Sequence, residues 1–188
     1  MIVLCDDKKE YGEMIDKLAE TVTKEFSLPK KSYIELSFVS AEEIKEINAE
    51  TREVDAVTDV LSFPNLDGIF GKRIRIKDFP FDVDPDTGML NLGCIVVCMD
   101  KILEQAKEFG TGEKREFSYL LTHGMLHVLG YDHMTDKDKA VMRKREEEIL
   151  EYHFDLIDSI SKILVQFFQN FIHFMIKISC IIHTQSYR

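Results

Sequence analysis

Three histidines within an eleven-residue stretch are the residues of this chain best suited to chemistry. His123 and His127 are four residues apart, so on a helix their imidazoles project from one face, about 6 Å apart along the axis. Gly130 favours a turn after that helix, and the turn can bring back His133 as a third ligand. Three protein ligands leave the fourth tetrahedral position of a zinc ion open, as in catalytic sites. The spacing therefore predicts one metal ion per chain, most simply Zn²⁺.

The same spacing occurs in a class of zinc proteases, and one residue argues against that function. The pattern His-x3-His-x5-His, with a glycine three residues after the second histidine, is that of the metzincins. In those proteases a glutamate follows the first histidine and acts as the general base. Gly124 occupies that position here. The residues therefore favour a metal centre without the base that peptide hydrolysis uses.

The elements that must position these histidines follow from hydrophobic periodicity and capping signals. Apolar residues around the first two histidines predict a buried helix. Ser40 and Glu43 have the spacing of a capping box, and Asp100 is a candidate cap for a later helix. A nearly all-apolar run at residues 90–99 predicts a central strand. The predicted helices span residues 10–26, 40–51, 100–109, 113–129 and 135–150, and the predicted strands span residues 33–39, 57–63 and 90–99.

Two groups of basic residues are candidates for contacts with an anionic substrate. Arg52 lies in a turn among acidic residues, and composition alone favours a surface ion pair over a phosphate clamp. Arg73, Arg75 and Lys77 alternate within a long predicted loop, residues 65–90, and could share one face of an extended segment. A solvated edge is the simpler interpretation of that segment, and a contact with a substrate backbone is the alternative.

The composition is that of a globular protein and limits the possible partners. The 188 residues carry a formal net charge of −10, which disfavours a general nucleic-acid coat protein. A nuclease with a local basic groove stays possible, because the local field guides the substrate. The start of the chain has no basic and apolar run typical of a secretion signal, so we expect a cytoplasmic protein.

The cysteines agree with a reducing compartment. Cys5, Cys94, Cys98 and Cys180 form no CxxC pair and no spacing typical of a disulfide framework. Cys94 and Cys98 lie on one face of the strand predicted at residues 90–99. A second metal site there is conceivable, but buried free thiols are the favoured interpretation.

The last part of the chain differs in character from the rest. Residues 153–188 form an apolar tail of unknown role after a domain at residues 1–152. The uncharged run between Lys162 and Lys177 has 14 residues, which is short of the ~20 needed to span a bilayer. An amphipathic helix that contacts the domain, a partner or a membrane surface is favoured.

Two motifs together resemble the YbeY endoribonuclease family. His123 to His133 matches the family pattern His-Gly-x-Leu-His-Leu-x-Gly-Tyr-Asp-His, with Val128 at one aliphatic position. Arg52 followed by the segment 58–64, Thr-Asp-Val-Leu-Ser-Phe-Pro, matches a second family block. The resemblance covers roughly residues 1–152 and implies a single α+β domain with a small mixed sheet packed against helices. Cys94 departs from it, because the family usually has an aspartate there.

The resemblance implies a zinc-dependent, single-strand-directed endoribonuclease. Its expected role is ribosomal RNA processing, including maturation of the 3′ end of small-subunit RNA, and ribosome quality control. Its expected partners are single-stranded or ribosomal RNA and the ribosome or its assembly proteins. Arg52 becomes a catalytic candidate that stabilises phosphoryl charge, and His123 a ligand that also takes part in proton transfer. Asp132 is expected to orient a neighbouring histidine.

Two other functions are weighed against this one. A zinc-stabilised ribosome-assembly factor would bind RNA or protein without cutting it. The open coordination position favours the enzyme over that alternative. A metalloprotease is disfavoured by Gly124.

Overall fold

The computed structural model describes residues 1–5 and 10–154. Residue contacts divide the chain into two compact units, residues 1–150 and residues 151–188. The first unit carries the sheet, the labelled helices and the three histidines. The apolar segment from residue 155 onward, for which an amphipathic helix was predicted, lies outside the described residues. No helix in the described part of the chain is both long and apolar enough to cross a bilayer.

A mixed four-stranded sheet with the order β1-β2-β4-β3 is the frame of the first unit. β1 and β2, and β2 and β4, pair in parallel, whereas β3 runs antiparallel to β4. The strands are β1 Ile2–Leu4, β2 Ser32–Val39, β3 Val60–Pro64 and β4 Leu90–Cys98. The helices are α1 Gly12–Glu25, α2 Ala41–Arg52, α3 Met99–Phe109 and α4 Glu113–Val128, with a further helix described over residues 136–154.

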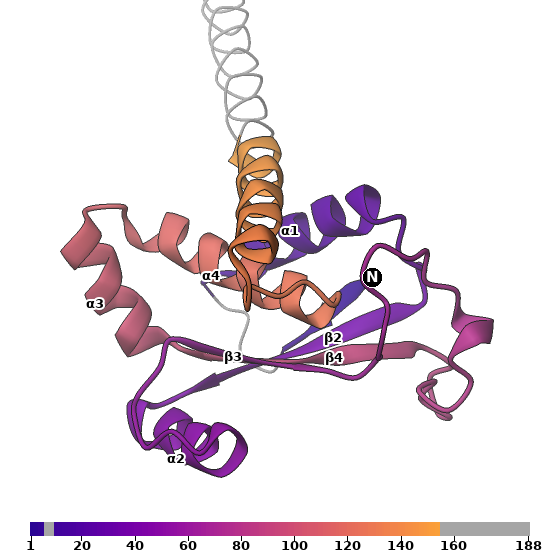
Figure 1. Ribbon diagram of the computed structural model, residues 1–188, viewed down its shortest axis with the longest axis horizontal. Coiled ribbons are helices and arrows are strands. Elements are labelled where there is room, and N and C mark those ends of the chain that lie inside the picture. Colours follow the sequence, from indigo (N-terminus) through magenta and orange to yellow (C-terminus); the bar gives the residue numbers. More distant parts are fainter. Residues whose placement is uncertain (6–9, 155–188) are drawn as a thin grey trace, which may run out of the picture. The chain divides into compact units, whose positions relative to one another are not determined.

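β4 is buried along almost its whole length because helices cover both faces of the sheet (Figure 1). Its pairing with β2 skips Leu92, and this bulge shifts the alternation of side chains along the strand. Val96 and Cys98 consequently pack with Ile44 beneath α2. The residues of β4 that face the larger core, on the side of α1 and α4, are Leu90, Leu92, Ile95 and Val97.

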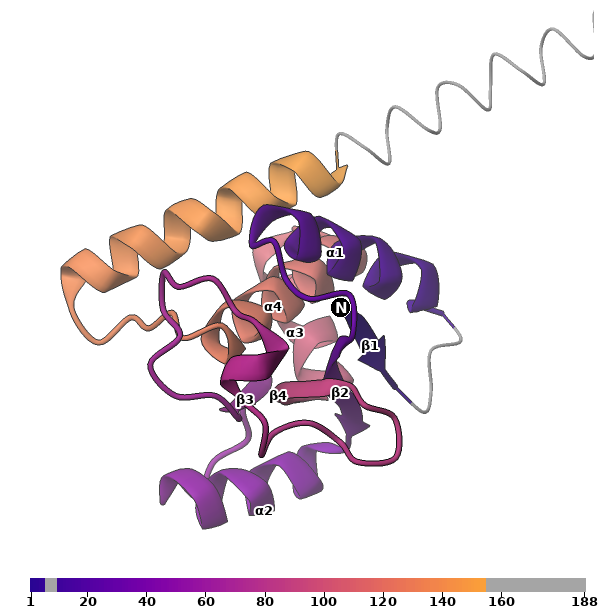
Figure 2. The same ribbon diagram turned by 90° about the vertical axis from the view of Figure 1, so that its right-hand side faces the viewer.

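The larger core lies between the sheet and the helices α1, α3 and α4, with α2 alone on the opposite face (Figure 2). Apolar residues of α1 recur at the spacing of one helix face and are fully buried. Phe117 of α4 stacks on Phe38 of β2 at 5.9 Å between ring centroids, which ties the histidine helix to the sheet. The arrangement confirms the predicted α+β domain with a small mixed sheet.

Two predicted boundaries were wrong, for identifiable reasons. The strand predicted at residues 57–63 begins only at Val60, which pairs with Val97. Its first three predicted residues have no strand to pair with, because β4 ends at Cys98 and α3 follows directly. Asp100 is not the N-cap of α3. It lies in the first turn of that helix, where its negative charge interacts favourably with the helix dipole.

Candidate metal centre

Helix α4 lies unusually close to the sheet, and Gly124 makes this approach possible. A Cβ at Gly124 would lie 3.1 Å from Ser62 Oγ of β3 and 3.1 Å from Ile95 Cγ2 of β4. Gly124 therefore faces the sheet, whereas the neighbouring His123 and the following His127 are half-buried and line a cavity. The position that holds the general base in metzincins thus points away from the histidine cluster.

The turn after α4 brings the third histidine back to the first two. Gly130 adopts a φ of 84°, in the left-handed region where a side chain is strained, and its N–H donates to the carbonyl of His127. The N–H of His133 donates to Asp132 Oδ1 at 2.7 Å. Asp132 therefore fixes the backbone of the turn. No contact of its carboxylate with an imidazole ring is seen among the described residues.

The three imidazoles converge on one point. One ligand atom from each of His123, His127 and His133 lies within 4.8 Å of the other two. The Nε2 atoms of His123 and His127 are 3.0 Å apart. Two nitrogen ligands of one tetrahedral zinc ion lie about 3.3 Å apart, given Zn–N bonds of about 2.0–2.1 Å. Within the described residues this is the only group of three or more metal-ligating side chains.

The hydrogen bonds behind the rings leave Nε2 as the ligating atom of both helix histidines. Nδ1 of His127 lies 3.0 Å from the carbonyl oxygen of Tyr131, which can only accept, so this Nδ1 carries the proton. Nδ1 of His123 lies 2.7 Å from a carboxylate oxygen of Glu146. Each Nε2 therefore presents a lone pair to the other. Two such lone pairs at 3.0 Å repel unless a proton or a metal ion lies between them. The donor set thus fits a metal ion.

Glu146 is the residue of this centre that the sequence did not identify. Its side chain is only 4% exposed, although it follows three basic residues in a highly charged segment of the helix that starts at residue 136. A buried carboxylate needs a partner, and Glu146 has one in the His123 ring and a second in the side chain of Tyr119. Residues that hold a metal-ligating imidazole by its second nitrogen fix its tautomer and orientation.

Burial keeps one of the ligands neutral. Burial lowers the pKa of His127, and the neighbouring His123 and His133 lower it further. A metal ion binds the neutral imidazole, so this shift favours the ligating form at neutral pH.

Arg52 lies beside the histidines in one cavity of about 650 Å³. It ends α2, a helix that begins with the predicted capping box, in which Ser40 and Glu43 exchange hydrogen bonds. Nη2 of Arg52 donates to the carbonyl of Ser62 at 3.0 Å, and its guanidinium lies 5.8 Å from the centre of the Phe63 ring. Arg52 is otherwise an exposed residue. The structure thus brings together Arg52, His123, His127 and His133.

The other sequence candidates lie elsewhere. Residues 72–75 are irregular and lead into a short 3₁₀ helix, Ile76–Asp78, so they form no strand face. Arg75 is paired with Asp78 at 2.7 Å, and Lys77 lies in that helix. Arg73 lines two smaller cavities.

The two strand cysteines are not part of the centre. Cys94 and Cys98 do share one face of β4, but it is the face covered by α2, opposite the histidine helix. Burial raises the pKa of the Cys94 thiol, so it stays protonated at neutral pH. Both are free thiols, as predicted; Cys98 is buried and Cys94 is half-buried.

Comparison with known proteins assigns the family. The Endoribonuclease YbeY family matches residues 4–153. An Endoribonuclease YbeY of Clostridium botulinum is 47% identical over 145 residues, which cover 75% of this chain and 87% of the relative. One of Clostridium beijerinckii is 46% identical over 79% of this chain and 95% of the relative. A solution structure from Thermotoga maritima, 26% identical, superposes with a TM-score of 0.54 over 85% of this chain and 93% of the other. The chain therefore belongs to the YbeY endoribonuclease family.

Proposed function

We propose that this protein is a metal-dependent endoribonuclease that hydrolyses phosphodiester bonds in RNA. The observation that carries the proposal is the convergence of three imidazole ligands and an exposed arginine in one open cavity. The similar proteins of two Clostridium species are named endoribonucleases, which supports RNA as the substrate class. A metal centre next to a guanidinium suits an anionic phosphoryl group better than a neutral peptide.

Each side chain has a distinct task in this mechanism. A metal ion held by His123, His127 and His133 would polarise the phosphate or activate a water molecule for attack. Arg52 binds the phosphoryl oxygens and stabilises the negative charge that builds on them as the P–O bond to the water oxygen forms and the P–O bond to the leaving ribose oxygen breaks. The carbonyl of Ser62 fixes one edge of its guanidinium, and the other N–H groups stay available to donate to phosphoryl oxygens.

His123 has a further role through its second nitrogen. With Nε2 used as a ligand, the ring exchanges a proton only at Nδ1, which faces Glu146 at 2.7 Å. His123 and Glu146 thus hold a proton just behind the reacting groups. Proton exchange by His123 is therefore limited to Glu146, and its effect on the reaction is to tune Nε2 as a ligand.

Finer features of the function are part of the same proposal. Three neutral imidazoles favour zinc as the resident ion. A cavity of about 650 Å³ has the size of a small-ligand site and accommodates an extended strand better than a duplex. The family resemblance supports ribosomal RNA as the target, including the 3′ end of small-subunit RNA, with roles in ribosome quality control. It also supports contacts with the ribosome or its assembly proteins, in the cytoplasm.

The test is cleavage of single-stranded RNA by purified variants. We expect wild-type protein to cut, and Arg52→Ala and His123→Ala to lose at least about 100-fold in rate. Arg115→Ala is the matched control, because it removes an exposed guanidinium of α4 that does not line the cavity. Equal cleavage by all four proteins would indicate a contaminating nuclease and end the proposal.

Metal removal separates the enzyme from a zinc-stabilised assembly factor that binds without cutting. None of the three histidines belongs to the hydrophobic core of the described residues, so chelation should stop cleavage and leave the protein folded. Unfolding on chelation, with no RNA cleavage by the loaded protein, would support the assembly factor. Protease activity is disfavoured because Gly124 faces the sheet, and casein with added zinc should remain intact.

A further inference from the structure

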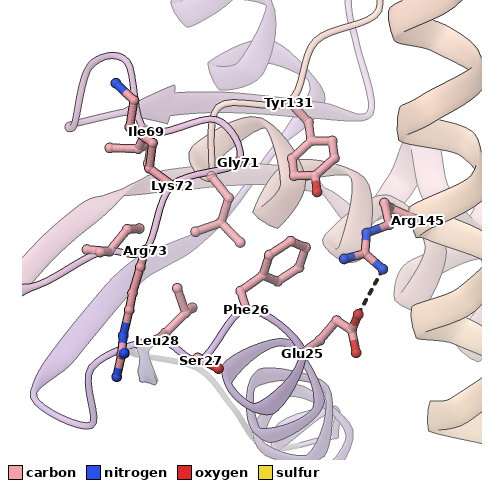
Figure 3. Close-up of a pocket in the computed structure, with 12 residues that line it drawn as sticks. Glu25, Phe26, Ser27, Leu28, Ile69, Gly71, Lys72, Arg73, Tyr131 and Arg145 are labelled. Atoms are coloured by element: carbon pink, nitrogen blue, oxygen red, sulfur yellow. Dashed lines mark hydrogen bonds and ion pairs between the residues drawn. The ribbon is translucent and has the colours of Figure 1, made fainter.

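The cavity lined by Arg52 and the three histidines is named the metal cavity. A second cavity adjoins it and shares one residue with it. It measures about 430 Å³ and lies between the end of α1, the loop around residue 72 and the helix that starts at residue 136 (Figure 3). Tyr131, which follows Gly130 in the turn after α4, lines both cavities. The two cavities therefore meet at the side chain of Tyr131.

The interior of this cavity presents aromatic rings. Phe26 and Tyr131 are both half-buried and meet edge to face, with 5.8 Å between ring centroids and an angle of 74°. The guanidinium of Arg145 lies 5.4 Å from the centre of the Phe26 ring. Arg145 is held by Glu25 at 2.8 Å and Glu148 at 2.7 Å, so its charge is balanced and its plane is fixed. The Tyr131 ring is held further by Phe70, at 4.9 Å between ring centroids, so Phe26 and Tyr131 form a fixed aromatic platform for a flat ligand.

The rim of the cavity carries two exposed cations. Lys72 and Arg73 are exposed, and neither forms an ion pair with a residue in the described ranges 1–5 and 10–154. Figure 3 shows Phe26 between Arg145 on one side and the Lys72–Arg73 segment on the other, with the charged ends of that segment directed outward. An aromatic interior below a cationic rim is complementary to a nucleotide, whose base is flat and whose phosphate is anionic.

We propose that this cavity is a nucleotide subsite for the RNA strand that runs through the metal cavity. The base of a nucleotide beyond the cleaved bond packs against Phe26 and Tyr131, and the backbone phosphates contact Lys72 and Arg73. The inference rests on the proposed function for the identity of the strand. It assigns a role to Arg73 and excludes Arg75, whose guanidinium is already paired with Asp78.

Binding of RNA of two lengths tests the subsite. The full chain is treated with chelator to prevent turnover, and the Kd for a fluorescent single-stranded decanucleotide is measured by anisotropy. We expect the double variant Lys72→Glu/Arg73→Glu to raise this Kd about tenfold or more. The slope of log Kd against log salt should fall by about 1.4, because two phosphate contacts are lost. Phe26→Leu should raise Kd about fivefold with an unchanged salt slope.

Two comparisons control for general charge effects. Lys107→Glu/Lys114→Glu reverses two exposed lysines on α3 and α4 that line neither cavity, and it should bind the decanucleotide within about twofold of wild type. A trinucleotide that fills only the metal cavity should be cleaved by the metal-loaded Lys72→Glu/Arg73→Glu protein with the wild-type KM. Equal losses in the two double variants, or for both RNA lengths, would overturn the subsite.

The outcomes separate this inference from the proposed function. If wild-type protein binds the decanucleotide through Phe26 and Lys72 but never cleaves it, the endoribonuclease proposal fails and the subsite stands. If wild-type protein cleaves RNA and the cavity variants bind as tightly as wild type, the subsite fails and the endoribonuclease proposal stands.

Discussion

The metal cavity has two walls that are built in different ways. The histidine wall, formed by His123, His127 and His133, comes from a helix packed on the sheet and a turn fixed by hydrogen bonds. The arginine wall is formed by Arg52, which is exposed and held to β3 by one hydrogen bond to a carbonyl. The difference matches two chemical demands. Metal ligands must hold their geometry within a fraction of an ångström, and here several packed residues do this, whereas the charge-stabilising guanidinium depends on its hydrogen bond to Ser62 for its position.

The largest effect is expected from removing one of the three histidines of the histidine wall. His127→Ala removes one of three ligands, so metal affinity should fall by more than about 100-fold and RNA cleavage should fall with it. Metal content by mass spectrometry and cleavage rate measure the two effects. Retained metal together with full activity would show that the histidines are not the metal centre.

The second-largest effect is expected from changing Glu146, which holds the ring of His123 in place. Glu146→Gln keeps the size of the side chain but removes the charge that holds Nδ1 of His123, and metal affinity should fall about 10–100-fold. Competition with a chelating dye measures this affinity without any substrate. The neighbouring Glu147→Gln is the matched control, since Glu147 is exposed and pairs only with Arg143 among the described residues. Equal affinities in the two variants would contradict the role of Glu146.

A conservative change in the arginine wall should affect rate without affecting metal. Arg52→Lys keeps the charge but loses the planar fork, and we expect kcat to fall roughly tenfold, the value of one charge-assisted hydrogen bond. Metal content should stay at the wild-type level. A parallel Arg115→Lys variant should behave as wild type. If Arg52→Lys loses metal instead, the two walls are not independent.

The smallest effect concerns the packing that brings the histidine wall to the sheet. Gly124→Ala places a methyl group 3.1 Å from Ser62 and Ile95, and overpacking of this kind costs about 1–3 kcal/mol. Alanine is favoured over glycine within a helix by about 1 kcal/mol, so the net loss in unfolding free energy should be on the order of 1 kcal/mol. Chemical denaturation measures it. A gain in stability would mean that helix and sheet are not in close contact.

Local signals in the sequence predicted the parts of the fold that depend on local interactions. The capping box of Ser40 and Glu43 and the glycine turn after α4 are contacts between near neighbours, and the structure contains both. The start of β3 could not be read locally, because it depends on where β4 ends, some 38 residues later. The two cavities could not be predicted either, since each is lined by segments far apart in the chain.

Glu146 shows how the candidate site could have been predicted more fully. Surrounded by charged residues, it looks like part of a solvated helix face. Met142 and Ile149 stand four residues before and three residues after it, which places all three on one buried stripe. A lone carboxylate on an apolar stripe needs a buried partner, and the periodicity of this helix was the available signal.

The close contact at Gly124 limits how the catalytic repertoire of this scaffold can change. Installing a glutamate there would give the chain the complete sequence signature of a zinc protease. Its carboxylate would nevertheless be driven toward Ser62 and Ile95 and not toward a scissile peptide. A chain that carries the full peptidase motif would thus be a destabilised hydrolase. Conversion into a peptidase would require a larger distance between helix α4 and the strands β3 and β4.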